Sequence, residues 1–436
     1  MIGGKAMTAI NRRTFVQLSG ATAFAGALGL PHVARAAGGK VVIIGGGPGG
    51  ATTARYLKLA NPDIDVTLIE PNELYHTCFM SNEVLGGERT IEQIQVGYDG
   101  LKKIGVNVVH DFATGIDGGA KTVATKGGQS FAFDRCVVAP GIDFNYTHEG
   151  ITEADAGNVP HAWKAGEQTT ILRKQLEAME DGGLVAIVAP ADPFRCPPGP
   201  YERASLIAGY LKEHKPKSKV IIIDPKEKFA KQGLFTGAWK KLYGFETDNS
   251  LIEWLPFAKV GGISKVDAGT KEIVTDFETF KPAVLNYIPQ QTAGKIAMDA
   301  GLADEKGWCP VDKQTFESKK VAGVHVIGDA AIATAMPKSG YSANSQGKVT
   351  AAAIAAILAG KEPVTPSYVN TCYSIAGKDY GFSVAAVYRY NAEKDVIGGV
   401  EGAGGLTPGD ASPEQFKREV GYAHSWYNNI RKDSWG

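Results

Sequence analysis

The chain carries no excess charge of either sign, because 46 Lys and Arg residues balance 46 Asp and Glu residues. It has no long basic run either, so nucleic acid and anionic membrane surfaces are poor candidate partners. After the first 36 residues no segment is apolar enough to cross a bilayer, which takes about 20 residues. The sequence also lacks a C-x-x-C-H motif and any Cys/His spacing typical of zinc. We therefore expect neither a haem nor a metal site on this chain.

A dinucleotide-binding pattern follows at the start of the expected fold. A strand, a glycine-rich turn, a helix and a second strand are predicted in that order, at 40–44, 45–50, 51–59 and 65–69. Gly45 permits the tight turn, Gly47 lets the backbone approach a pyrophosphate, and Gly50 lets the helix pack on the strand. Glu70 ends the second strand, where a carboxylate accepts hydrogen bonds from a ribose hydroxyl. The pattern predicts a Rossmann-like unit.

The far part of the chain favours FAD over NAD in this unit. A strand predicted at 324–327 ends in Gly328 and Asp329, and a helix-prone tract follows at 345–358. In two-domain flavoproteins such a Gly-Asp returns to the first domain, and its carboxylate holds the ribityl chain of the flavin. The helix after it directs its positive end at the ring. The segment 135–141 is similar to the strand that crosses between the two domains of such proteins.

A second Rossmann-like unit is predicted from strands at 183–188 and 220–224. The intervening loop, residues 189–200, contains no G-x-G-x-x-G and is rich in proline, which removes the amide donors that a pyrophosphate needs. A nicotinamide dinucleotide would therefore find a degenerate site, and the electron partner should be another molecule.

These patterns predict an α/β fold with two Rossmann-like dinucleotide-binding domains, of the glutathione-reductase type, and a C-terminal interface region. The length of 436 residues also exceeds what one hydrophobic core usually supports. We expect an FAD-binding domain in two parts, a second Rossmann-like domain between them, and the C-terminal region, at 37–150 with 281–360, 151–280 and 361–436.

Residues 1–36 are typical of an export signal. Arg12 and Arg13 stand before an apolar stretch over 15–30, and Ala34-Arg35-Ala36 has the small-x-small pattern at which signal peptidases cut. An arginine pair can be the ordinary positive charge of a signal peptide. Followed by Phe15, and on a cofactor protein, it favours twin-arginine export, which carries folded proteins. We expect a twin-arginine-type signal peptide over 1–36 and a periplasmic mature protein.

Five cysteines are present, an odd number for an oxidising compartment. Cys136 and Cys309 lie in strand-like surroundings, where buried free thiols are expected. Cys196 lies in the proline-rich loop beside Arg195, whose charge favours a thiolate. If Cys196 and Cys372 both reach the flavin they could form a redox disulfide, and a staple between domains fits their positions equally well. Cys78, after the strand that carries Glu70, has no evident role from its position alone.

The chain resembles the flavoprotein subunit of flavocytochrome c sulfide dehydrogenase, a relative of sulfide:quinone oxidoreductases. The resemblance covers the expected mature chain and rests on long motifs: the 45–50 turn, Tyr75-His76-Thr77-Cys78, Arg195-Cys196-Pro197-Pro198-Gly199-Pro200-Tyr201-Glu202, Gly328-Asp329-Ala330, Pro337-Lys338-Ser339-Gly340 and Trp426. It implies that Cys78 bonds covalently to the 8α carbon of FAD and that Cys196 and Cys372 form a redox-active disulfide.

The same resemblance implies a role for Glu202 in proton handling and for Trp426 in covering the site. It implies a c-type cytochrome subunit as partner, which carries the haem c, and hydrosulfide as substrate, oxidised to sulfur or a persulfide. The chain would be an enzyme, a sulfide:cytochrome c oxidoreductase.

Three other functions compete with this interpretation. A sulfide:quinone oxidoreductase needs an apolar surface for quinone and an amphipathic, membrane-facing C-terminal stretch. Residues 414–436 are polar with scattered aromatics (Tyr422, Trp426 and Tyr427) and fit a protein contact better. An NADH-dependent disulfide or ferredoxin reductase is disfavoured by the proline-rich second loop. A non-catalytic flavin-binding partner of a cytochrome is the third alternative.

Overall fold

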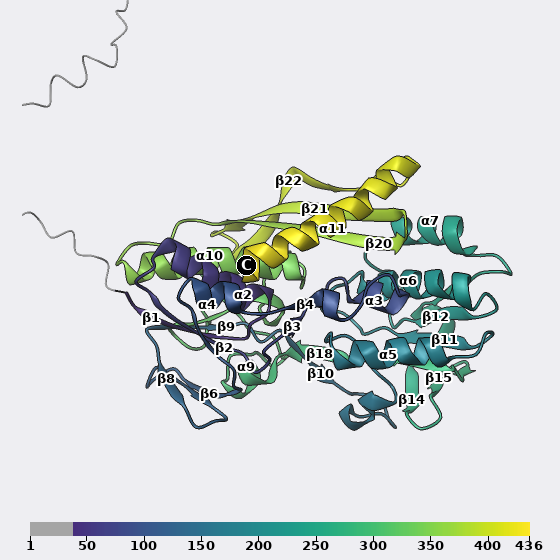
Figure 1. The fold of residues 1–436 in the computed structure, drawn as a ribbon, viewed down its shortest axis with the longest axis horizontal. Helices are drawn as coiled ribbons and strands as arrows, with labels where there is room; N and C mark the ends of the chain where they lie inside the picture. The colour runs from purple at the N-terminus through teal and green to yellow at the C-terminus, as the bar shows by residue number, and fades with distance from the viewer. Residues whose placement is uncertain (1–37) are drawn as a thin grey trace, which may run out of the picture. The chain divides into compact units, whose positions relative to one another are not determined.

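A parallel sheet in the order β19-β9-β1-β2-β5 forms the centre of the first unit (Figure 1). The computed structural model describes residues 38–436, so the predicted signal peptide at 1–36 lies outside the described residues. The central strand β1 (Lys40–Ile44) pairs with β2 (Asp65–Ile69) and with β9 (Arg135–Val138). β1 is buried along almost its whole length, as expected for a parallel strand covered on both faces.

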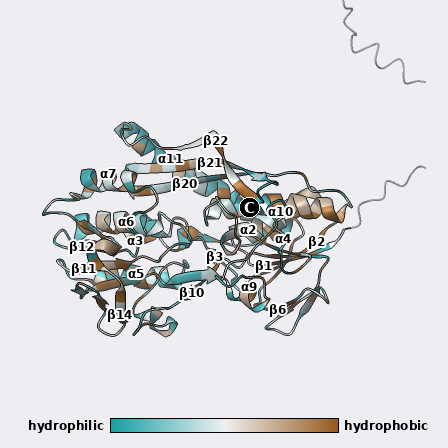
Figure 2. Cartoon of the chain, turned by 180° about the vertical axis from the view of Figure 1, so that it is seen from behind, coloured by the Kyte–Doolittle hydropathy of each residue, from teal (hydrophilic) through white to brown (hydrophobic). Residues whose placement is uncertain are grey.

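Two long helices of the first unit come from opposite ends of the chain. α2 (Pro48–Ala60) packs against α10 (Gly340–Leu358), so residues about 300 apart lie side by side. α10 begins at Gly340, earlier than the predicted tract at 345, because the Ser339 side chain caps it by accepting a hydrogen bond from the Ser342 amide at 3.1 Å. Figure 2 shows the apolar character of α10.

The remaining elements of the first unit are short. They are β3 (Tyr75–His76), α3 (Ser81–Gly86), η1 (Glu92–Ile94), β4 (Gln95–Val96), α4 (Asp99–Lys103), β5 (Asn107–Val109), β6 (Ala113–Asp117), β7 (Thr122–Thr125), β8 (Ser130–Ala132), α9 (Lys295–Asp299), β19 (Val324–Val326) and η3 (Gly328–Ala330).

The second unit is built on a parallel sheet in the order β13-β12-β11-β17. β11 (Leu184–Val188) leads through the proline-rich loop into α6 (Gly199–His214), and β12 (Lys219–Ile223) follows. Its other elements are η2 (Glu153–Gly157), α5 (Glu167–Ala178), α7 (Gln232–Tyr243), β13 (Ile252–Leu255), α8 (Phe257–Val260), β14 (Ile263–Asp267), β15 (Glu272–Thr275), β16 (Thr279–Phe280) and β17 (Val284–Tyr287). The predicted α/β fold with two Rossmann-like units is confirmed.

Two crossing strands connect the units. β10 (Ile142–Asn145) leaves the first unit and pairs antiparallel with β18 (Gln290–Ala293), on which the chain returns. β19 then joins the first sheet beside β9. β17 pairs with β11, so the second sheet extends a few residues past the boundary predicted at 280.

The C-terminal region forms an antiparallel sheet of β20 (Ser367–Gly377), β21 (Tyr380–Asn391) and β22 (Val396–Leu406), followed by α11 (Pro413–Trp435). β20 contacts α10 of the first unit and both α6 and α7 of the second. Figure 1 shows this region running along both units. The cysteine on β20 is therefore held where the two units meet.

The expectation that the tail 414–436 forms a contact with another protein is corrected in part. Its buried residues recur at helical spacing, at Phe416, Val420, Ala423, Tyr427 and Ile430, and they pack on the chain itself. Trp435 is 3% exposed, and its indole donates a hydrogen bond to the Gly46 carbonyl at 3.0 Å. Tyr422 remains outside, 53% exposed. The apolar side of α11 is thus used within this molecule.

Candidate functional site

Two adjoining cavities lie at the carboxyl ends of the parallel strands. The larger one measures about 790 Å³ and belongs to the first unit, and the smaller one measures about 100 Å³. Cys78, Arg195 and Gly340 line both cavities. A ligand in the larger cavity would therefore share a wall with whatever enters the smaller one.

The glycine-rich turn shapes the larger cavity. A Cβ on Gly50 would lie 1.9 Å from the Gly45 carbonyl oxygen, so helix and strand need glycine there to approach each other. Gly47 lines the cavity, and the nearest protein atom to a Cβ there would be the Tyr75 hydroxyl at an ordinary 3.4 Å. No protein atom therefore forbids a side chain at position 47. Such a side chain would instead take up space in the cavity, where a ligand must approach the backbone. The cavity is large enough for a dinucleotide, and the turn leads into the N-terminus of α2, which favours phosphate.

The two predicted acidic residues, Glu70 and Asp329, both line the larger cavity. Glu70 is buried, lines the larger cavity and accepts a hydrogen bond from the Gly46 amide at 2.8 Å. Asp329 lines the same cavity, and within residues 38–436 its Oδ1 is buried without a hydrogen-bond partner. Burial raises the pKa of this carboxyl, although Arg195 and Lys338 oppose the shift. A buried acceptor without a donor is costly, so a ligand hydroxyl fits this place, and the residues of the cavity fit FAD.

Lys338 fixes the segment that carries Asp329. Its ammonium donates to the Asp329 carbonyl at 2.5 Å and to the Ala331 carbonyl at 3.2 Å, and it lies 3.7 Å from the centre of the Trp308 ring. Burial lowers the pKa of Lys338 to about 8. The Lys338 carbonyl accepts a hydrogen bond from the Cys196 amide at 2.8 Å. One residue thus links the flavin side of the site to the cysteine loop.

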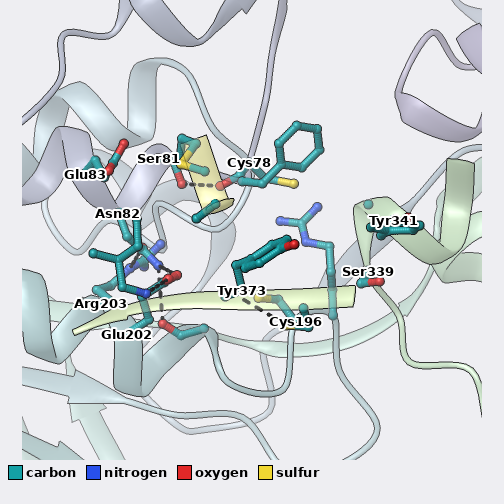
Figure 3. A pocket seen from close by; sticks show the side chains of 18 of the residues that line it. Cys78, Ser81, Asn82, Glu83, Cys196, Glu202, Arg203, Ser339, Tyr341 and Tyr373 are labelled. Carbon is teal, nitrogen blue, oxygen red and sulfur yellow. Dashed lines mark hydrogen bonds between the residues drawn. The ribbon is translucent and has the colours of Figure 1, made fainter. Parts of the chain in front are cut away.

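Cys78 lies between β3 and α3 and lines both cavities. Figure 3 shows it among residues of the smaller one. Its carbonyl accepts a hydrogen bond from the Ser81 hydroxyl at 2.6 Å, which fixes the backbone. The thiol is free and partly exposed. This is the position from which a sulfur could reach a flavin ring in the larger cavity.

The predicted catalytic residues come from different elements and line one cavity, the smaller one. They are Cys196 in the loop after β11, Glu202 in the first turn of α6, Cys372 on β20 and Trp426 on α11. Both cysteines are separate thiols in this structure, so their disulfide stays a prediction. The structure does place the two thiols in the wall of the same cavity.

Arg195 favours the thiolate of Cys196, as expected, but other groups outweigh it. Burial raises the pKa of the Cys196 thiol, and Cys372 and Glu202 raise it further. Arg195 lowers this pKa, but its contribution is smaller than the others. The loop after β11, with Cys196 in a left-handed conformation (φ 58°), places this partly buried thiol in the wall of the smaller cavity, where neighbouring protein replaces part of its hydration.

Glu202 points inward, although a glutamate in the first turn of a helix is usually exposed. One carboxylate oxygen accepts from the Asn82 side chain and the other from the Ile375 amide, both at 2.8 Å. Burial raises the pKa of this carboxyl despite these hydrogen bonds. A carboxyl group held between helix and strand, with a raised pKa, is able to hold and release a proton beside the thiols.

Trp426 forms one wall of the smaller cavity. Its ring stacks on Tyr341 with centroids 6.0 Å apart and meets the edge of Phe79 at 5.3 Å. These aromatic rings hold α11 over the site. The expectation that Trp426 covers the site agrees with this position.

Arg203 is a site residue that the sequence did not single out. It is 1% exposed, and its guanidinium donates to neutral acceptors, the Asn82 and Asn286 side chains and the carbonyls of His161 and Ala162. Burial lowers the pKa of Arg203 to about 9, which still leaves the group charged near neutral pH. Its place directly after Glu202 was the available signal. Its positive charge suits an anionic substrate.

In the second unit, protein side chains fill the space that corresponds to the dinucleotide cavity of the first unit. Asp224, at the end of β12, is fully buried and accepts from the Tyr201 hydroxyl at 2.6 Å and the Trp254 indole at 3.0 Å. Lys226 lies 2.6 Å from the same carboxylate. Tyr201 stacks on Phe229 with centroids 3.7 Å apart. A second dinucleotide finds no open cradle at this strand end.

Cys136 and Cys309 are buried free thiols, as predicted. Among the residues from Gly38 onward, no group of His, Cys, Asp and Glu side chains is arranged to hold a metal ion. Across the same part of the chain, no helix combines the length and apolarity that a membrane span requires.

Three family models match the chain. The central region of the sulfide dehydrogenase [flavocytochrome c] flavoprotein chain matches residues 169–289, and the flavin-binding region of flavocytochrome c sulphide dehydrogenase matches residues 364–435. A pyridine nucleotide-disulphide oxidoreductase model matches residues 39–181. The family models thus support flavin binding, and the residues of the larger cavity fit this cofactor.

Individual relatives agree with these models. A sulfide dehydrogenase [flavocytochrome c] flavoprotein chain of Chlorobaculum thiosulfatiphilum is 53% identical over 45 residues, which are 10% of this chain and 94% of that sequence. A sulfide-quinone reductase of Aquifex aeolicus (strain VF5) is 26% identical over 363 residues, 79% of this chain and 83% of the other.

A solved structure supports the fold. The sulfide:quinone oxidoreductase from the hyperthermophilic bacterium Aquifex aeolicus has a TM-score of 0.68 at 20% identity and covers 91% of this chain and 92% of that one. The two sulfide dehydrogenase models and the Chlorobaculum relative all name the same flavoprotein family. The chain is a sulfide-oxidising flavoprotein and belongs to the family of flavocytochrome c sulfide dehydrogenase flavoprotein chains.

Proposed function

We propose that this protein is a periplasmic sulfide:cytochrome c oxidoreductase, which oxidises hydrosulfide through a Cys196–Cys372 disulfide beside a covalently bound FAD. The observation that carries the proposal is that these two cysteines, one from the second unit and one from the C-terminal region, line one small cavity next to the dinucleotide cavity. Hydrosulfide is then a substrate of the right size and charge for that cavity.

The smaller cavity selects a small anion. Its volume is about 100 Å³, against about 790 Å³ for the larger cavity, so it suits a small substrate. Arg195 and Arg203 line it and supply positive charge. Attack of hydrosulfide on one sulfur of the disulfide expels the other as a thiolate and leaves a persulfide on the first. Glu202 lies within the same wall and is placed to exchange a proton with the substrate or product.

The flavin is the two-electron acceptor in this proposal. When bound, FAD takes up an electron pair and releases electrons singly, which suits a one-electron haem partner. Cys78, Gly47, Glu70 and Asp329 would hold it. A thioether from Cys78 to the flavin 8α carbon would keep the cofactor attached outside the cytoplasm, where replacement FAD is scarce.

A c-type cytochrome subunit carrying haem c is the proposed acceptor. The apolar side of α11 is buried against this chain, and its outer side carries polar and charged residues: Glu414, Lys417, Arg418, Ser425, Asn428, Asn429 and Lys432. This leaves the helix without an apolar face for a membrane, which the quinone alternative requires. The Aquifex relatives, named for quinone as acceptor, keep sulfide:quinone oxidoreductase as the second candidate.

Sulfide turnover tests the proposal. Purified holoprotein should reduce cytochrome c faster than a soluble quinone, and Cys196→Ser or Cys372→Ser should slow sulfide oxidation by about 100-fold or more. Cys136→Ser, a buried cysteine away from both cavities, is the matched control and should keep the rate. Normal turnover in Cys196→Ser would show that the disulfide has no part in the reaction, and faster quinone reduction would favour the second candidate.

The flavin attachment is tested separately. Acid precipitation of the holoprotein should leave the yellow chromophore on the polypeptide, and Cys78→Ser should release it into the supernatant. Mass spectrometry of the unreduced protein should place the flavin on the peptide containing Cys78 and join the peptides of Cys196 and Cys372. Free flavin from the unmodified protein would contradict the covalent bond.

A further inference from the structure

Lys231 approaches the cysteine pair from one side. It precedes α7 and holds a left-handed backbone conformation (φ 60°), which sends its side chain toward β20. The ammonium donates to the Cys372 carbonyl at 2.7 Å and to the Ser374 hydroxyl at 2.8 Å, and it lies 3.6 Å from the Cys372 sulfur. All three donors of this cation are therefore directed at the strand that carries Cys372.

Cys196 has a carboxyl group among its neighbours. Burial and the neighbouring Cys372 and Glu202 raise the pKa of its thiol, and Arg195 offsets this in part. The Arg195 guanidinium also donates a hydrogen bond to the Trp163 carbonyl. The Cys372 sulfur thus lies against a cation, whereas the Cys196 sulfur is buried beside the Glu202 carboxyl group.

We propose that Lys231 polarises the cysteine pair, so that Cys372 leaves as the thiolate and Cys196 keeps the incoming sulfur. This inference rests on the proposed function. Hydrosulfide forms a new S–S bond with the Cys196 sulfur, the Cys196–Cys372 bond breaks, and its electron pair passes to the Cys372 sulfur. The substrate keeps its proton in the Cys196 persulfide, and the single negative charge moves to Cys372. The substrate sulfur is oxidised and the disulfide is reduced, so no further reactant enters this step.

A purely structural role for Lys231 is the alternative. Its bonds to the Cys372 carbonyl and the Ser374 hydroxyl would tie α7 to β20 whatever the charge on the sulfur. The two roles differ in what they do to thiol reactivity, because a thiolate is the form that reacts with alkylating reagents. Removing a structural tie alone would leave the pH at which Cys372 ionises unchanged.

Alkylation of the reduced holoprotein separates these roles. The rate at which iodoacetamide modifies Cys372 is followed from pH 6 to pH 10 by mass spectrometry of its peptide. In Lys231→Met the midpoint of this profile should rise by about one pH unit, so that alkylation at neutral pH is about tenfold slower. Lys231→Arg should keep most of the original profile. Lys228→Met, an exposed lysine on the same loop, is the matched control and should leave it unchanged.

A second measurement locates the sulfur. The oxidised protein is given one equivalent of sulfide, trapped with iodoacetamide and digested, and the extra sulfur should be on the Cys196 peptide. An extra sulfur on Cys372, or an unchanged alkylation profile in Lys231→Met with intact flavin content and circular dichroism, overturns the proposal. If Lys231→Met does not fold, Lys231→Arg and the location of the sulfur decide. Absence of any persulfide in the wild type would instead count against the proposed function, whereas the alkylation profiles still test Lys231.

Discussion

The two Rossmann-like units end their first strands in opposite ways. After β1, glycines leave a turn that borders a cavity of about 790 Å³. After β11, the proline-rich loop and the buried Asp224 cluster fill the equivalent space, and the loop delivers Cys196 to a cavity of about 100 Å³. Both places lie at the carboxyl ends of parallel strands, where open α/β folds bind ligands.

The difference shows that one topological position can serve two chemistries. In the first unit the backbone is bare, so a large cofactor is held by amides and helix ends. In the second unit side chains occupy the dinucleotide space, and the loop places the thiol of Cys196 in the smaller cavity. Changes at the two strand ends should therefore have different consequences.

The largest effect is expected at the open strand end. Gly50→Ala would place its Cβ 1.9 Å from the Gly45 carbonyl oxygen, which only a shift of backbone can relieve. The flavin content of the purified protein, measured by visible absorbance, should fall by about tenfold or more. Gly209→Ala on α6 of the second unit meets only the Tyr243 hydroxyl closely, at 3.3 Å, and should keep its flavin. Full flavin content in Gly50→Ala would remove the distinction between the units.

A substitution at the filled strand end, after β11 and β12, should lower the free energy of unfolding. Asp224→Ala leaves Lys226 without its carboxylate partner in a buried site, which costs about 3–5 kcal/mol of unfolding free energy. Denaturant titration measures this loss, and the exposed Asp248→Ala should change stability by no more than about 0.5 kcal/mol. We also expect no NADH binding by Asp224→Ala, because the proline-rich loop remains. Gain of NADH binding would show that the acidic cluster, and not the loop, closes this site.

The smallest effect concerns α11, which borders both strand ends. His424 lies 2.5 Å from the Glu83 carboxylate, and this hydrogen bond raises the pKa of the imidazole above its ordinary value of 6.5. Burial raises the pKa of Glu83, but hydrogen bonds from His424 and Arg89 outweigh it, so the net shift is downward.

The sign of the pH dependence follows from the His424 shift. Because its pKa is higher in the folded state, its contribution to stability is complete below pH 6.5 and is lost as the pH rises through the folded value. His424→Gln should therefore lower stability by roughly 0.5–1 kcal/mol at pH 6, a small loss since the ring is partly exposed, and by less at pH 9. Thermal unfolding at the two pH values measures this. A difference that grows toward pH 9 would assign the stabilisation to another group.

The sequence was sufficient for the sheets and the glycine turn because these depend on local patterns. Apolar runs and glycine spacing are local, and the strands predicted at 40–44 and 65–69 appear with these bounds. The packing of the C-terminal helix on the chain itself was not predicted, although its buried residues recur at helical spacing. The contacts of Lys231 and Arg203 depend on how distant elements pack, since each reaches groups more than 40 residues away. The inward turn of Glu202 likewise depends on β20, 173 residues further along the chain.

The indole of Trp435 has a consequence for biosynthesis. It holds the carbonyl of Gly46, 389 positions earlier in the polypeptide. In a growing chain this carbonyl can therefore accept only from the Tyr98 hydroxyl, which lies 3.2 Å from it in the folded protein, until Trp435 has been added. The second hydrogen bond to the glycine turn thus forms only after β20 and its cysteine have been made.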